Sequence, residues 1–114
     1  MPSSTYPGEV LVVEDPMIQK LIREILVRQG YSVASLSPMQ AMEQALDRRG
    51  DFILITNTPA PFLELAGTIP LLYISGYPDR QLAARFRRCR VLPKPFHPPD
   101  LLEAVGELAG AAVT

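Results

Sequence analysis

The sequence contains few of the features that mark secreted, membrane or metal-stabilised proteins. It has one cysteine, Cys89, in 114 residues, which excludes an internal disulfide and leaves no second thiol for a metal site. No apolar run approaches the ~20 residues that a transmembrane helix needs, and the N-terminus lacks the basic-then-apolar order of a signal peptide. We therefore expect a soluble cytoplasmic protein in which Cys89 is a small core residue.

Neither sign of charge is in excess. Eleven basic and twelve acidic residues give a formal net charge of −1, so no overall field attracts the chain to nucleic acid or to a membrane surface. The length fits one domain that buries roughly 65% of its unfolded surface. We expect residues 1–8 to form a disordered tail and residues 9–110 to form this domain.

Short apolar runs alternate with segments of helical periodicity along the whole chain. The runs are Glu9–Val13, Tyr31–Leu36, Phe52–Ile55, Pro70–Ile74 and Val91–Leu92. In Val10–Val13 and Phe52–Ile55 successive positions are apolar, which is typical of strands that are covered on both faces. The alternation predicts an α/β fold in which helices flank a doubly wound parallel sheet.

Cap and stop signals delimit the first two helices. Asp15-Pro16 begins one that Gly30 ends, and Ser37-Pro38 begins one that Gly50 ends. The residues expected to face the core are Ile18, Leu21, Ile22, Ile25 and Leu26 in the first helix, and Met39, Met42, Ala45 and Leu46 in the second.

The later helical segments are less regular. Only ten residues lie between Pro59 and Thr68, fewer than a crossover with a full helix normally takes, so we expect at most about one helical turn there. A further helix is predicted after Pro78-Asp79, with Leu82, Phe86 and Cys89 on one face. The last helix is predicted to begin near Pro99-Asp100 and to bury Leu101, Leu102, Val105 and Leu108.

Three strings at the ends of these strands carry polar residues. They are VLVVED at Val10–Asp15, ISGYPD at Ile74–Asp79 and LPKPF at Leu92–Phe96. In this order and spacing they resemble the receiver domain of two-component response regulators, over nearly the whole chain. The resemblance implies a flavodoxin-like, five-stranded parallel sheet of order 2-1-3-4-5. The short connection after the third strand implies that the third helix is shortened or missing.

The resemblance also implies a site at the carboxyl ends of the strands. In receiver domains, an aspartate after the third strand accepts a phosphoryl group from a phosphohistidine of a sensor kinase. Glu14 and Asp15 match the two acids that hold Mg²⁺ in that family. Ser75 matches the hydroxyl residue that takes a phosphoryl oxygen, and Lys94 matches the lysine that pairs with the phosphoryl group.

The acceptor aspartate itself is absent. Its position falls on Thr56 when it is counted from Asp51 and the apolar run, and on Asn57 after a shift of one residue. Receiver transfer makes an acyl phosphate, so the acceptor must be a carboxylate, which neither residue has. With one ligand gone, Glu14 and Asp15 form an incomplete Mg²⁺ shell. We therefore expect no cofactor and no metal beyond weak Mg²⁺ binding there.

Two further positions bear on this site. The aromatic residue that receivers usually have three positions before the lysine is Val91 in this sequence, so no ring can report phosphorylation. The resemblance implies a cis Lys94-Pro95 bond, the isomer that aims the lysine into the crevice. A purely structural interpretation stays open, in which Asp15 caps a helix and forms an ion pair with Lys94.

These departures favour a degenerate receiver, or pseudo-receiver. Its expected function is that of a phosphorylation-independent interaction module in two-component signal transduction, without enzymatic activity. The expected partner is a histidine kinase, a response regulator or a second copy of the chain. The resemblance places the output surface at the fourth helix, fifth strand and fifth helix, so the candidate docking patch is Arg85, Arg87, Arg88 and Arg90. A solvated helix face would explain the same arginines.

Two other functions compete with this hypothesis. A working phospho-receiver, which accepts a phosphoryl group from a sensor histidine kinase, needs the carboxylate that Thr56 and Asn57 lack. A binder of flavin or nucleotide phosphate needs a loop of glycines and hydroxyls after the first strand. Glu14-Asp15-Pro16 occupies that position and repels phosphate.

Overall fold

Five strands and five helical segments alternate along the part of the chain that the computed structural model describes, residues 8–48 and 52–113. In chain order they are β1 (Glu9–Val13), α1 (Pro16–Arg28), β2 (Ser32–Ser35), α2 (Pro38–Arg48), β3 (Phe52–Thr56), the 3₁₀ helix η1 (Ala60–Leu65), β4 (Pro70–Ser75), α3 (Arg80–Ala83), β5 (Arg88–Pro93) and α4 (Pro98–Val113). The predicted tail, apart from Gly8, and the predicted stop at Gly50 lie outside the described residues.

All neighbouring strands are parallel, and their order in the sheet is β2-β1-β3-β4-β5. The five residues of β3 are all buried, and so are the last four of β1. Because successive side chains of a strand point to opposite faces, these runs require cover on both sides of the sheet. The predicted flavodoxin-like architecture and strand order are confirmed.

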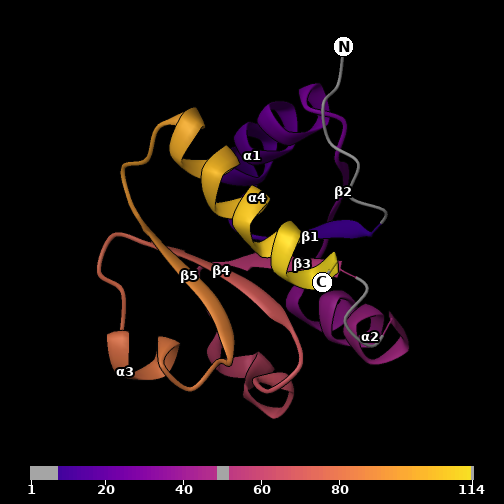
Figure 1. Cartoon of the computed structure of the whole chain (residues 1–114), viewed down its shortest axis with the longest axis vertical. Helices are drawn as coiled ribbons and strands as arrows, with labels where there is room; N and C mark the ends of the chain where they lie inside the picture. The colour runs from indigo at the N-terminus through magenta and orange to yellow at the C-terminus, as the bar shows by residue number, and fades with distance from the viewer. Residues whose placement is uncertain (1–7, 49–51, 114) are drawn as a thin grey trace.

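Two helix layers supply this cover (Figure 1). On one face, Ile22 and Leu26 of α1 and Leu101 and Val105 of α4 pack against alternate residues of the central strands. On the other face, α2, η1 and α3 cover the remaining positions in a second cluster that contains Phe62. No helix within residues 8–48 and 52–113 is long and apolar enough to span a membrane.

The helix starts follow their predicted caps. Asp15 Oδ1 accepts hydrogen bonds from the backbone N–H groups of Met17 and Ile18, at 3.1 and 3.2 Å. At α2, Gln40 N–H donates to Ser37 Oγ at 3.2 Å and Ser37 N–H donates to Gln40 Oε1 at 3.0 Å. This reciprocal capping box fixes the chain direction directly after β2.

The face that α2 turns to the sheet differs from the prediction. Ala41 and Ala45 are buried, whereas Met39 is 74% and Leu46 is 58% exposed. The prediction of Ala45 and Met42 as inward residues is confirmed, since Ala45 is buried and Met42 packs partly buried against the same cluster. The prediction of Met39 and Leu46 was wrong, because the small Ala41 takes the inward position next to Ala45.

The connection after β3 is short, as predicted, and forms the six-residue 3₁₀ helix η1 with no α-helix. The helix predicted after Pro78-Asp79 is a single turn, capped by Asp79 Oδ1, which accepts from Leu82 N–H at 3.0 Å. Cys89 therefore lies on β5, not on a helix, because residues 88–93 pair with β4. Phe86 and Cys89 still face the same cluster, so the predicted side was correct and the predicted conformation was wrong.

Cys89 is half-buried on this strand. Burial raises the pKa of its thiol to about 11, because the thiolate loses hydration there. The thiol is therefore protonated at neutral pH, in keeping with the expected core role and against a reactive one.

We expect Phe62→Ala to destabilise the fold by about 3–5 kcal/mol, since Phe62 is fully buried in the second core cluster and its truncation leaves a cavity there. Leu46→Ala is the control and should cost less than about 0.5 kcal/mol because Leu46 lies mostly in solvent. Urea denaturation of both variants measures these losses. Similar losses in the two variants would contradict the packing described above.

Candidate functional site

Polar residues meet where the strands end. Glu14 and Asp15 follow β1, Asn57 follows β3, and Lys94 follows β5, while Ser75 is the last residue of β4. The register pairs Val13 with Thr56 and Ser75 with Pro93, so these ends lie level at one end of the sheet. The sequence-predicted site residues Glu14, Asp15, Thr56, Asn57, Ser75 and Lys94 are thus brought to one end of the sheet.

An ion pair crosses this end of the sheet. Lys94 Nζ lies 3.0 Å from Glu14 Oε2, and the Glu14 side chain is fully buried whereas the Lys94 side chain is 27% exposed. Glu14 Oε1 accepts a hydrogen bond of 3.1 Å from Asp15 N–H. A buried carboxylate is costly unless a cation is close, so Lys94 serves as the counter-ion of Glu14.

Asp15 has a different role from its neighbour. It is exposed, and its Oδ1 is occupied by the two backbone N–H groups at the start of α1. The purely structural interpretation is thus correct about the helix cap but wrong about the ion pair, since the partner of Lys94 is Glu14. The reason is geometric, because the capping geometry holds the Asp15 carboxylate at the helix end.

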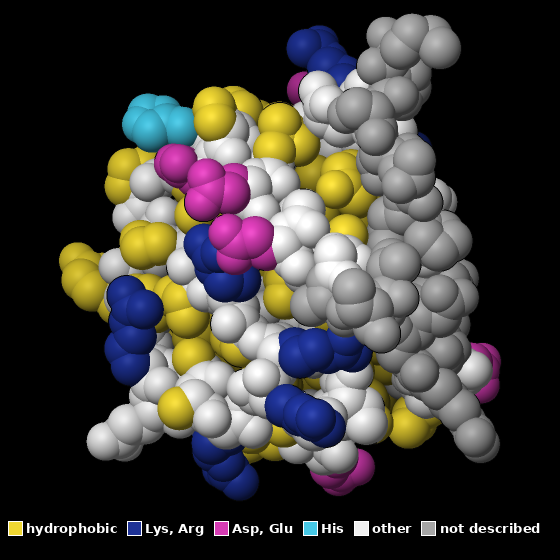
Figure 2. Space-filling model, viewed as in Figure 1, with side chains coloured by type: hydrophobic (Ala, Val, Ile, Leu, Met, Phe, Trp, Pro, Cys, Tyr) yellow, Lys and Arg dark blue, Asp and Glu magenta, His cyan; other side chains and the backbone are white. Residues whose placement is uncertain are grey.

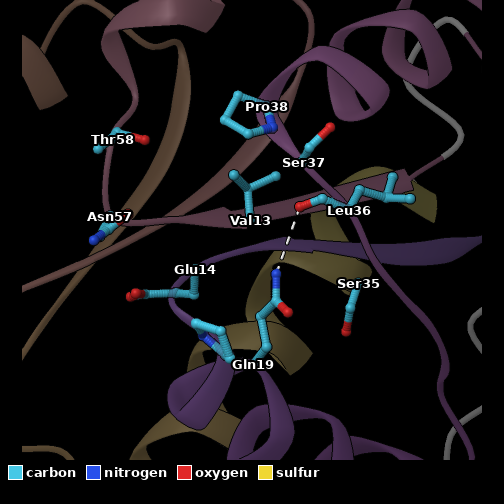
Figure 3. A pocket seen from close by; sticks show the side chains of 10 residues that line it. Val13, Glu14, Gln19, Ser35, Leu36, Ser37, Pro38, Asn57 and Thr58 are labelled. Carbon is cyan, nitrogen blue, oxygen red and sulfur yellow. Dashed lines mark hydrogen bonds between the residues drawn. The ribbon is translucent and has the colours of Figure 1, made fainter.

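The two candidate acceptor positions differ in accessibility. Thr56 is fully buried, and its Oγ1 accepts a hydrogen bond of 3.1 Å from Thr58 N–H. It has the same parity as Leu54, which faces the cluster beneath α2 and η1. Asn57 is exposed and lines a hollow together with Glu14 (Figure 3). Only Asn57 is open to a reactant from solvent.

Ser75 and Lys94 are joined through the backbone. Lys94 N–H donates to the carbonyl oxygen of Ser75 at 2.9 Å, and Ser75 Oγ accepts from Tyr77 N–H at 3.1 Å. The Lys94-Pro95 peptide bond is cis, which confirms that prediction. Val91 is half-buried in the cluster on the α3 side and offers no aromatic ring next to the site.

The donor set does not fit a resident Mg²⁺ ion. Among residues 8–48 and 52–113 there is no group of three or more His, Cys, Asp or Glu side chains that could hold a metal. Glu14 is engaged with Lys94, and one oxygen of Asp15 caps α1. Mg²⁺ requires several oxygen ligands in near-octahedral geometry, and Asn57 adds only a neutral one.

The ion pair separates two hollows. The first, of about 400 Å³, lies over the ends of β1, β2 and β3 and is lined by Glu14 but not by Lys94. In Figure 3 its walls also include Gln19, whose amide reaches Leu36 O at 3.5 Å. The second, of about 510 Å³, lies between α1 and the loops after β4 and β5, and is lined by Lys94 but not by Glu14.

Sequence reasoning missed the residues that form the second hollow. Leu21 was assigned to the core by its helical spacing, but it is 43% exposed, and Tyr77 is 97% exposed. Phe96, at the end of the LPKPF string, lines the same hollow. Leu21 lies at the flank of the apolar stripe of α1, and this position was the signal in the sequence that it could be exposed.

The arginines of the candidate docking patch do not share one helix face. Arg88 and Arg90 lie on β5, where Arg90 forms an ion pair with Glu107 of α4 and Arg88 donates to Thr68 O at 3.0 Å. Arg85 and Arg87 are exposed in the turn before β5. The alternative explanation of these arginines as one solvated helix face is wrong, because the helix ends at Ala83. Figure 2 shows basic side chains below a row of acidic ones on the face that α4 covers.

Comparison with known proteins places this arrangement among known folds. No family model and no curated protein matches the chain. Chemotaxis protein CheY4 of Vibrio cholerae superimposes with a TM-score of 0.72 and 23% identity, covering 89% of this chain and 98% of that chain. The signal receiver domain of an HD domain-containing protein from Pseudomonas fluorescens Pf-5 gives a TM-score of 0.75 and 20% identity, covering 98% and 93%.

A longer structure matches over part of its length. NtrX from Brucella abortus, in complex with ADP, gives a TM-score of 0.73 and 20% identity, covering 92% of this chain. This chain spans only 26% of NtrX. The structural neighbours are receiver domains of response regulators, and at these identities the likeness shows the fold alone.

We expect replacement of Lys94 to destabilise the fold more than replacement of Glu14. Lys94→Met leaves a fully buried carboxylate without its cation and should lower the free energy of unfolding by about 3–5 kcal/mol. Glu14→Gln leaves an ammonium group that reaches solvent, and should cost only about 1–2 kcal/mol. Urea denaturation at neutral pH measures both values.

The double variant Glu14→Gln/Lys94→Met is the control for this pair. It removes both charges and should be more stable than Lys94→Met alone, since no unpaired carboxylate remains. Equal losses for the two single variants, or a double variant less stable than either, would refute the assignment of Lys94 as the counter-ion of Glu14.

Proposed function

We propose, with the receiver-like fold as the premise, that the chain is a phosphorylation-independent interaction module of two-component signal transduction and not an enzyme. One observation carries the proposal. The accessible residue after β3 is Asn57, and the hydroxyl of Thr56 before it is fully buried. Neither side chain can form the acyl phosphate that receiver transfer requires, because an acyl phosphate needs a carboxylate, whereas Asn57 carries a neutral amide and Thr56 a buried hydroxyl.

The state of Lys94 supports the same proposal. In a receiver the corresponding lysine forms an ion pair with the phosphoryl group, whereas Lys94 already forms an ion pair with the buried Glu14. A lysine whose charge is balanced within the protein does not need a phosphoryl group to hold its position. With Val91 in place of an aromatic residue, no ring at that position couples the crevice to the α3 and β5 side.

The partner in this proposal is a signalling protein, either a histidine kinase, a response regulator or a second copy of the chain. Arg85 and Arg87 are exposed in one short turn and are free to meet a partner. Arg88 and Arg90 are anchored beside them on β5 and extend the positive surface. Guanidinium groups bind carboxylates through two parallel hydrogen bonds, so we infer an acidic docking surface on the partner.

Incubation with acetyl phosphate and Mg²⁺ should leave no acyl phosphate on the unmodified chain, as measured by intact-mass spectrometry. Stoichiometric phosphorylation of the unmodified chain would overturn the proposal.

Two variants test the acceptor position. Asn57→Asp should raise Mg²⁺ affinity by supplying a third carboxylate, because position 57 is exposed and accepts a charge without burying it. Thr56→Asp should instead destabilise the fold, since it places an unpaired charge in the core.

Charge reversal in the turn before β5 should weaken partner binding. We expect Arg85→Glu/Arg87→Glu to lower the affinity for a sensor kinase, a response regulator or a second copy by about tenfold, through repulsion from an acidic surface. Arg23→Glu on the exposed face of α1 is the matched control and should have little effect. Surface plasmon resonance and sedimentation velocity measure the two kinds of binding. An unchanged affinity in the double variant would exclude this turn as the docking surface.

A further inference from the structure

The hollow beside Lys94 is apolar except for one charge. Its walls come from three segments: Ile18 and Leu21 of α1, Gly76 and Tyr77 after β4, and residues 94–96 after β5. No Asp or Glu is among the described residues that line it. Its volume of about 510 Å³ falls within the ~300–1,000 Å³ range of small-molecule sites.

The apolar walls are more exposed than the fold requires. Tyr77 is 97% exposed and Leu21 is 43% exposed, and neither packs in either core cluster. Across the hollow, Phe96 is half-buried against the α1 and α4 cluster. A ligand between these side chains would remove apolar surface from water without displacing any core contact, which favours an apolar or aromatic body.

The single charge lies on the correct side to orient such a ligand. Glu14 lines only the hollow on the β2 side, and Lys94 lines only this one, so the cationic end of the ion pair faces the apolar walls. The Lys94 ammonium has three donors, its contact with Glu14 Oε2 at 3.0 Å is an ion pair without a hydrogen bond, and 27% of its side chain remains exposed. An anionic group in the hollow would therefore meet the ammonium with the carboxylate behind it.

We propose that this hollow binds a small amphipathic organic acid, with its carboxylate on Lys94 Nζ and its aromatic or acyl body between Tyr77, Phe96 and Leu21. The site is separate from the turn of Arg85 and Arg87 and requires no phosphorylation, so it stands or falls independently of the docking function. This ligand class is inferred because the residues that line the hollow include one cation, Lys94, no carboxylate, and otherwise mainly apolar side chains.

Three near-isosteric probes test the charge requirement: benzoate, benzamide and benzamidine, which are anionic, neutral and cationic. We expect benzoate to bind the full chain with a Kd on the order of 1 mM, as suits a ligand of this size. Benzamide should bind at least about fivefold more weakly, and benzamidine more weakly still, because each loses the charge-assisted contact. Amide shifts in a ¹H–¹⁵N NMR titration should centre on Leu21, Gly76, Tyr77 and Phe96.

Two variants on α1 test the place of binding. Leu21→Glu puts a carboxylate into the wall and should abolish benzoate binding, whereas Val27→Glu, at a position that is 47% exposed on the same helix, should leave it unchanged. The double variant Glu14→Gln/Lys94→Met should lose the preference for benzoate over benzamide. Equal binding of the three probes, shifts outside the hollow, or benzoate binding that survives Leu21→Glu would overturn the proposal.

Discussion

The constraint on which the structure depends is the complete burial of its central strands. All of β3 and nearly all of β1 are buried, and Thr56 is the one polar residue of β3, so the sheet is stable only between two helix layers. Because the strands are parallel, their carboxyl ends all lie at the same end of the sheet. The polar residues that follow the strands are therefore gathered at that end by the fold itself.

At that end one ion pair organises the polar groups. The side chain of Glu14 is fully buried, and Lys94 reaches it from the loop after β5. One hollow lies on the side of Glu14 and another on the side of Lys94. Neither Thr56 nor Asn57 carries a carboxylate, so the anion beside Lys94 comes from Glu14, directly after β1, and not from the end of β3.

Much of the fold was readable from the sequence because the signals were local. Strand runs, Asp15 and Ser37 as caps, and the strings around Glu14, Ser75 and Lys94 gave the elements, their order and the residues at the strand ends. What failed depended on packing across the molecule. Ala41 rather than Met39 faces the sheet, because helix–sheet distance is set by small residues. Residues 88–90 joined β5 because β4 was available to pair with them. The choice of Glu14 over Asp15 as the partner of Lys94 required knowing which carboxylate the helix start uses.

The two outer strands of the sheet have a consequence for how the molecule can assemble. Strand β2 is only four residues long and is bounded by Ser32 and Ser35, while β5 carries Arg88, Arg90 and, at its end, Pro93, which has no N–H to donate. Short length, charge and proline are the devices by which open sheet edges resist pairing with further strands. Growth of the sheet from molecule to molecule, and with it fibril formation by strand addition, is disfavoured at both borders. Association is thereby left to side chains on the helical layers and loops, where specificity can be encoded residue by residue.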